Sequence, residues 1–129
     1  MVNNDFIKIV DIDIIDEEYN EAVVMIENKG IVFPCFTYDI KFPIDFDFVT
    51  FECMTEEQAI ISENKDSNIE CLDNNFQCKI TGKLLDRTKA EVVVNDLKLH
   101  VDSTIIPGDI KTGDFIEFKA ERIDIEDIT

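Results

Sequence analysis

The stretch from Lys89 to Val101 constrains the fold more than any other part of the sequence. Apolar and polar residues alternate on both sides of a break at Asn95-Asp96. Asn and Asp both tolerate positive φ, so the pattern predicts a tight β-hairpin. On one face the paired side chains are all apolar: Val94 with Leu97, Val92 with Leu99, and Ala90 with Val101. A wholly apolar face must be buried, so we expect this hairpin to form one wall of a β-sheet core.

The opposite face of the hairpin sets Glu91 against His100, the only histidine. A carboxylate beside an imidazole favours the protonated ring, so we expect the pKa of His100 to be raised. A lone histidine of this kind is more often part of a surface pair than a catalytic base. The hairpin therefore predicts a structural pair, not an active site.

Several other segments change the phase of their apolar alternation part-way along. In residues 6–15 the apolar positions move from odd to even numbers, in 44–53 from even to odd, and in 115–125 the phase slips again near the end. One inserted residue turns the following side chains to the other face, so each change predicts a β-bulge or a bend. Repeated bends favour a coiled barrel over a flat sandwich.

Further strands are predicted over 21–27, 31–41, 69–72 and 76–81. Pro34 interrupts the second of these, and because proline cannot donate to a ladder we expect an edge position or a bulge there. Thr55-Glu56-Glu57-Gln58 fits a capping box, which predicts one short helix over residues 56–62.

These patterns predict a mainly β protein with a single domain over residues 1–129, a small antiparallel barrel or barrel-like sandwich. The segment from Pro107 to Arg122, a Gly-Asp turn entering an Ile-x-Phe strand, resembles the last turn and strand of OB-type barrels. The aromatic, basic surface strands with which such barrels stack bases are missing. The first and last predicted strands also resemble each other, and we expect them to close the barrel together.

The charge balance is the most extreme property of the composition. Twelve basic and 29 acidic side chains give a formal net charge of −17 and a pI of about 4.1, while 45% hydrophobic residues argue against a disordered chain. Such a field disfavours nucleic acids and anionic membranes, and it favours basic partners. Neither a signal peptide nor a membrane-spanning stretch is recognisable, so we expect a cytoplasmic protein.

The four cysteines, Cys35, Cys53, Cys71 and Cys78, are scattered and form no C-x-x-C pair. Without a secretory signal, reduced thiols are expected. The spacing does not favour a zinc site, and we predict no metal and no cofactor.

Carboxylates recur in pairs two residues apart, which on a strand places both on one face. Such pairs can contact a cation or a basic partner, or they can simply be solvated charges that guard an apolar strand. The candidate partner-binding residues are Asp11, Asp13, Asp45, Asp47, Asp124 and Glu126.

The sequence leaves three functions open. The first is a small acidic binding module for a basic protein, comparable to immunity proteins or DNA mimics. The second is a ligand-binding barrel or minor enzyme with a cavity lined by the Phe-rich segment, and the third is a subunit of a phage or secretion assembly. We find no nucleophile elbow and no phosphate-binding Gly-rich loop, which favours a non-catalytic protein. Catalytic activity and the oligomeric state are left open.

Overall fold

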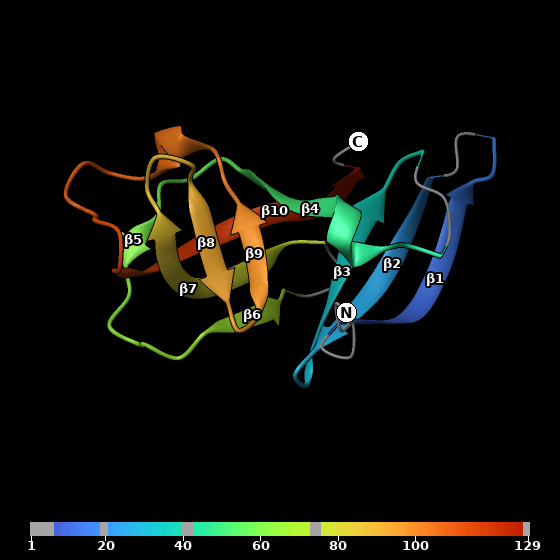
Figure 1. Cartoon of the computed structure of the whole chain (residues 1–129), viewed down its shortest axis with the longest axis horizontal. Coiled ribbons are helices and arrows are strands. Elements are labelled where there is room, and N and C mark those ends of the chain that lie inside the picture. Colours follow the sequence, from blue (N-terminus) through green and yellow to red (C-terminus); the bar gives the residue numbers. More distant parts are fainter. Residues whose placement is uncertain (1–6, 19–20, 40–42, 73–75, 128–129) are drawn as a thin grey trace.

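The computed structural model describes residues 7–18, 21–39, 43–72 and 76–127, and these are mainly β (Figure 1). The strands are β1 Lys8–Asp16, β2 Glu21–Asn28, β3 Ile31–Thr37, β4 Val49–Thr55, β5 Ile60–Ile61, β6 Asn68–Cys71, β7 Cys78–Asp86, β8 Glu91–Val94, β9 Leu97–His100 and β10 Phe115–Asp127. Two single 3₁₀ turns, η2 Phe46–Phe48 and η3 Ser103–Ile105, interrupt the loops. In the described part of the chain, no helix is long and apolar enough to cross a membrane.

Five strands close a barrel in the order β10, β4, β9, β8, β7, with β7 pairing back to β10. All of these pairings are antiparallel except that of β4 with β9, which is parallel. The predicted fold class, a small barrel, is therefore confirmed. The last turn of the barrel, which contains Gly113, leads into β10.

A three-stranded extension, β1-β2-β3, continues the sheet beyond the barrel (Figure 1). It joins β10 through a parallel ladder of two pairs, Phe36 with Asp124 and Thr37 with Ile125. The edge position or bulge predicted at Pro34 is wrong, because β3 lies between β2 and β10 and its register with β2 is unbroken there. Pro34 pairs with Met25 on β2 and lies outside the short ladder to β10, so its missing N–H costs that ladder nothing. Residues 40 and 41 of the predicted third strand lie outside the described residues.

The hairpin of β8 and β9 has the predicted register. Val94 pairs with Leu97 and Val92 with Leu99, and all four side chains are buried in the core. Asn95 adopts a positive φ of 54°, which explains the choice of an Asn-Asp turn. The tip of this hairpin is tied to the extension, since the Asp96 carboxylate lies 2.9 Å from Nζ of Lys29 in the turn between β2 and β3.

The phase changes mark real irregularities in the ladders. In β1 the register shifts between Ile9 and Asp11 and again between Ile14 and Asp16. In β10 the buried positions change from even to odd numbers where the strand leaves β7 and pairs with β4. The buried residues of β10 are Ile116, Phe118, Ala120, Ile123 and Ile125.

The helix predicted over residues 56–62 is wrong. This segment is extended: Ile60 and Ile61 form β5, which pairs with β10, and both are exposed. The amide of Ala59 donates to the carbonyl of Ile105 and that of Ser62 to the carbonyl of Phe115, each at 2.8 Å. A single cap stabilises so short a helix only a little, so the hydrogen bonds that the extended segment makes to the rest of the protein outweigh it.

Two other strand predictions need correction. Residues 44–48, predicted as the first half of a strand, instead lead into and form the η2 turn, and only the second half of that run is β4. The first and last strands do not close the barrel, because β1 pairs with β2 whereas β7 pairs with β10. Phe6, predicted to start the first strand, lies outside the described residues.

Only part of the Phe-rich segment lies in the core. The rings of Phe33 and Phe51 meet edge to face at 6.5 Å, and that of Phe46 stacks on Phe51 at 6.2 Å. Phe33 and Phe51 are buried. These three rings pack on one another, whereas Tyr38 and Phe48 are exposed, so the core-filling role holds for part of the segment.

Candidate functional site

The outer face of the sheet carries one continuous line of paired residues from the extension to the barrel. Residues that are directly opposite in a ladder share a face, so the pairings can be followed from strand to strand. We call this line the cross-strand row; in order it comprises Asp13, Val23, Phe36, Asp124, Glu52, His100 and Glu91. Four of its seven members are acidic, and it crosses β1, β2, β3, β10, β4, β9 and β8.

At the barrel end of the row, His100 is held between two carboxylates. Its Nδ1 lies 2.8 Å from Oε2 of Glu52, and its Nε2 lies 3.0 Å from Oε2 of Glu91. Burial lowers the pKa of His100, but the hydrogen bonds with Glu91 and Glu52 and the charges of both carboxylates together raise it above 6.5. The protonated ring donates to both partners and joins three barrel strands.

This arrangement is structural. Both ring nitrogens are engaged, so neither can take a proton from a substrate without first giving up a carboxylate. The Glu91–His100 pair and the direction of the pKa shift agree with the sequence prediction. Glu52 was missed because it lies 48 residues from His100 in the chain.

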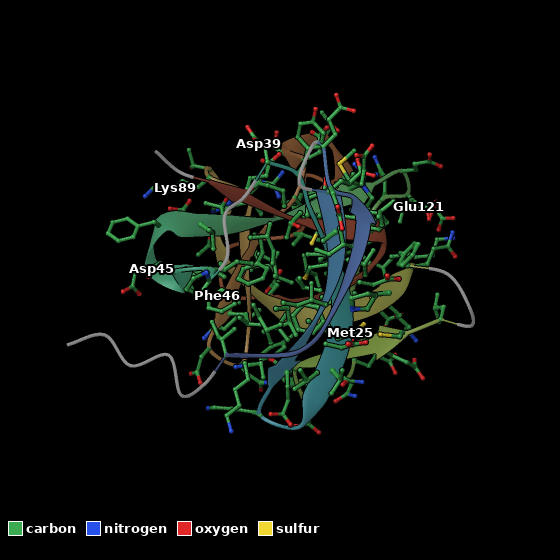
Figure 2. All side chains as sticks on the ribbon, turned by 90° about the vertical axis from the view of Figure 1, so that its right-hand side faces the viewer. Met25, Asp39, Asp45, Phe46, Lys89 and Glu121 are labelled. Atoms are coloured by element: carbon green, nitrogen blue, oxygen red, sulfur yellow. The ribbon has the colours of Figure 1, made fainter. Side chains whose placement is uncertain are left out.

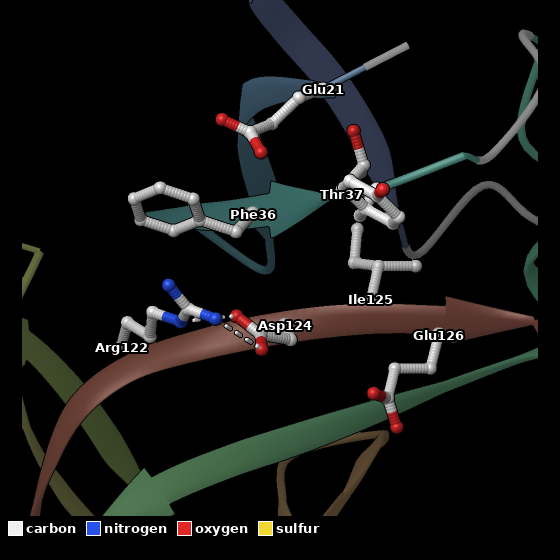
Figure 3. Close-up of a pocket in the computed structure, with 8 residues that line it drawn as sticks. Glu21, Phe36, Thr37, Arg122, Asp124, Ile125 and Glu126 are labelled. Atoms are coloured by element: carbon white, nitrogen blue, oxygen red, sulfur yellow. Dashed lines mark hydrogen bonds and ion pairs between the residues drawn. The ribbon is translucent and has the colours of Figure 1, made fainter. Parts of the chain in front are cut away.

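In the middle of the row, a pocket of about 310 Å³ opens between β3 and the second half of β10 (Figure 3). It is lined by Glu21, Phe36, Thr37, Tyr38, Arg122, Asp124, Ile125 and Glu126. It forms where the β3–β10 ladder covers only two residue pairs, so the strands diverge on either side of it.

Arg122 is fixed on the wall of the pocket by a carboxylate and an aromatic ring. Its Nε lies 2.9 Å from Oδ1 of Asp124, and its Nη2 donates to Oδ2 of the same residue at 3.2 Å. The guanidinium carbon lies 4.9 Å from the centre of the Phe36 ring, which in turn meets Phe76 edge to face at 4.6 Å. Such a cation–π contact orients the arginine along the sheet.

The pocket remains negative after this internal pair is formed. Its lining holds three carboxylates, those of Glu21, Asp124 and Glu126, against the single guanidinium of Arg122. Asp124 forms an ion pair with Arg122, whereas within the described residues no cationic side chain pairs with Glu21 or Glu126. Glu21 lies on the Phe36 side of the pocket, whereas the side chain of Glu126 extends from β10 toward β4 (Figure 3). A cationic group beside Glu21 gains both charge pairing and contact with a π face.

The structure brings four of the six predicted partner-binding residues onto this face. Asp124 and Glu126 line the pocket, and Asp13 belongs to the same row. Three strand spacings of about 4.8 Å separate Asp13 from Asp124, roughly 14 Å in all. Asp11 lies opposite Met25, one pleat further along the same face.

Asp45 and Asp47 lie elsewhere. They flank the start of η2, where the carboxylate of Asp45 accepts from the amide of Asp47 at 3.1 Å, so they are not neighbours on a strand face as predicted. In Figure 2, Asp45 is well separated from Met25, the residue opposite Asp11. This carboxylate pair serves the turn before β4.

The cysteines offer no comparable site. All four are free; Cys71 is exposed and the other three are buried. Within the described ranges, no group of three or more His, Cys, Asp or Glu side chains is placed to hold a metal ion.

A scan against protein-family models and searches of curated proteins and of solved structures found no match. The sequence contained one unused signal for the pocket, since Arg122 and Asp124 stand two residues apart on one strand face.

Proposed function

We propose that the protein is a small acidic binding module that recognises a basic protein, without catalysing a reaction. The observation that carries the proposal is the pocket between β3 and β10, where Glu21 and Glu126 face a cavity of about 310 Å³ bordered by aromatic rings. A lysine or arginine side chain of the partner enters this pocket. The rest of the row supplies further carboxylates along the partner's surface.

The charge of the whole chain acts in the same direction. A net charge of −17 draws a basic protein toward the acidic face and raises the rate of encounter. Binding of this type weakens as salt screens the charges, over a Debye length of about 8 Å at physiological ionic strength. A partner covered in this way loses access to its own anionic ligand, which is how immunity proteins and DNA mimics act on nucleases.

The test is capture of a partner from the parent cell on the immobilised protein, followed by elution in a salt gradient. We expect a basic protein that is retained at low salt and released at moderate salt. The variant Glu21→Gln/Glu126→Gln should then bind the purified partner at least tenfold more weakly. If no protein is retained at low salt and released at moderate salt, the proposal is contradicted.

A matched control separates the pocket from bulk charge. Glu63→Gln/Asp109→Asn removes the same formal charge from two exposed positions in the loops that follow β5 and η3. These loops lie at the end of the barrel away from the β1-β2-β3 extension (Figure 1). We expect this control to change affinity by no more than about twofold. Equal losses in both double variants would show that the pocket is not the binding site.

A further inference from the structure

We propose that the partner contributes a β-strand with alternating basic and apolar residues, which adds to the outer edge of β1. This inference rests on the proposed function and specifies both the form of the partner segment and the surface that receives it. Four observations carry it: an open strand edge, exposed apolar side chains on that strand, acidic residues between them, and continuity with the cross-strand row.

The outer edge of β1 is open. The strand stands first in the sheet order, and in the described part of the chain it pairs with β2 alone (Figures 1 and 2). The edge of an open sheet presents unpaired N–H and C=O groups to any extended chain that approaches it. One of the β1 amides, that of Ile12, donates to Oδ1 of the neighbouring Asp11 at 3.0 Å.

The apolar side chains of β1 are exposed to an unusual degree for a strand. The exposed fractions are 54% for Val10, 43% for Ile12, 43% for Ile14 and 51% for Ile15. Ile12 and Ile14 share the face of β1 that continues the core side of the sheet, opposite Val24 and Ala22. An added strand would bury β-branched side chains that the chain itself leaves in water.

The acidic side chains decide which kind of strand is accepted. Asp11 and Asp13 are both exposed and lie on the outer face of β1. A second copy of this chain, pairing antiparallel about Ile12, would set Asp11 against Asp13, and directly opposed like charges destabilise a ladder. A partner strand with lysine or arginine at alternate positions pairs with the same carboxylates, so charge complementarity selects a basic segment over self-association.

The position of Asp13 links this edge to the pocket. Asp13 is the terminal member of the cross-strand row that also holds Phe36 and Asp124. A strand added beside β1 takes the next place in that row. One partner can therefore contact both the edge and the pocket side of the outer face.

The experiment uses the full chain and synthetic peptides of about ten residues. One peptide alternates lysine and valine, and the other has the same composition with its lysines and valines in separate blocks. We expect the alternating peptide to bind at least tenfold more tightly, and to protect β1 amides from hydrogen exchange. Asp11→Asn/Asp13→Asn should reduce that preference at least fivefold, whereas Glu63→Gln/Asp109→Asn should leave it within about twofold.

The outcomes distinguish the two proposals. Equal binding of both peptides without β1 protection, together with loss in Glu21→Gln/Glu126→Gln, would overturn the strand-addition proposal and leave the acidic binding module standing. If neither peptide binds at low salt and no basic partner is captured, both the strand-addition proposal and the proposed function are overturned. Dimerisation of the free chain that protects β1 would show that a second copy occupies the edge and would also overturn strand addition by a basic partner.

Discussion

Nδ1 of His100 lies 2.8 Å from Oε2 of Glu52 across the boundary between β9 and β4. These two strands form the one parallel pair of the barrel, and their ladder covers only two residue pairs. The contact therefore reinforces the shortest pairing in the closed ring. On its other side the same imidazole meets Glu91, so one side chain holds three adjacent strands.

The stability of the protein is expected to fall as the pH rises through the pKa of His100. That pKa is raised above 6.5 in the folded protein, so the folded state binds the proton more tightly than the unfolded chain. The extra stability is fully present below the unfolded value and is lost as pH rises through the folded one. Denaturant unfolding at a series of pH values from about 5.5 to 9 measures it.

The variant His100→Gln should remove this pH dependence. At low pH it loses two hydrogen bonds to charged groups, for which we expect a cost of about 1–2 kcal/mol. At high pH, where the ring is already neutral, the difference from the wild type should shrink. A constant difference across the whole range would contradict the role given to protonation.

Arg87→Ala should destabilise the loop between β9 and β10. The guanidinium of Arg87 donates to three carbonyls in this loop, those of Pro107, Ile110 and Ile106, at 3.0, 2.6 and 3.3 Å. Loss of these bonds should lower the free energy of unfolding by about 2–3 kcal/mol. Arg87→Lys keeps the charge but cannot span all three acceptors, and an intermediate loss is expected by chemical denaturation.

Gly82→Ala should destabilise the barrel by about 2–3 kcal/mol. A Cβ at this position would lie 2.7 Å from Cγ1 of Val92, 2.8 Å from the carbonyl oxygen of Val93 and 2.9 Å from Cγ2 of Val94. The backbone oxygen cannot move without disturbing β8. Gly108→Ala is the matched control, because its Cβ would meet nothing within 4 Å, and thermal melts should show little change.

One thiol of the native protein should react with a disulfide reagent well before the other three. Burial raises the pKa of all four thiols, that of Cys78 to about 12, but Cys71 is exposed to a reagent whereas Cys35, Cys53 and Cys78 are buried. At pH 8 we expect one rapid equivalent per chain, and four after unfolding in guanidinium. Cys71→Ser should abolish the rapid phase, and a rapid phase that persists would contradict the assignment.

Local rules predicted the parts of the fold that depend on neighbouring residues. The Asn95-Asp96 turn and the alternation around it determine the β8–β9 register, and the phase changes locate the bulge after Ile9 and the bend in β10. The helix predicted from the capping box at Thr55 is wrong, because a local cap is weaker than the hydrogen bonds that Ala59 and Ser62 make to distant parts of the chain.

The candidate site was only partly predictable for the same reason. The i, i+2 spacing placed Asp124 and Glu126 on one face, and the hairpin register paired His100 with Glu91. The pocket, by contrast, depends on β3 lying beside β10. No local sequence pattern predicts that these two strands are neighbours. The aromatic residues of the pocket, Phe36 and Tyr38, could be placed beside Arg122 and Asp124 only once the strand order was known.

The way β10 serves the rest of the sheet has a consequence for the order of folding. This strand pairs with β3, β4, β5 and β7, and it follows all four of them in the chain. Until β10 docks, the ring stays open, and β4 and β7 expose unpaired strand edges. Closure of the barrel therefore waits for β10, and we expect docking of this strand to be a late step of folding.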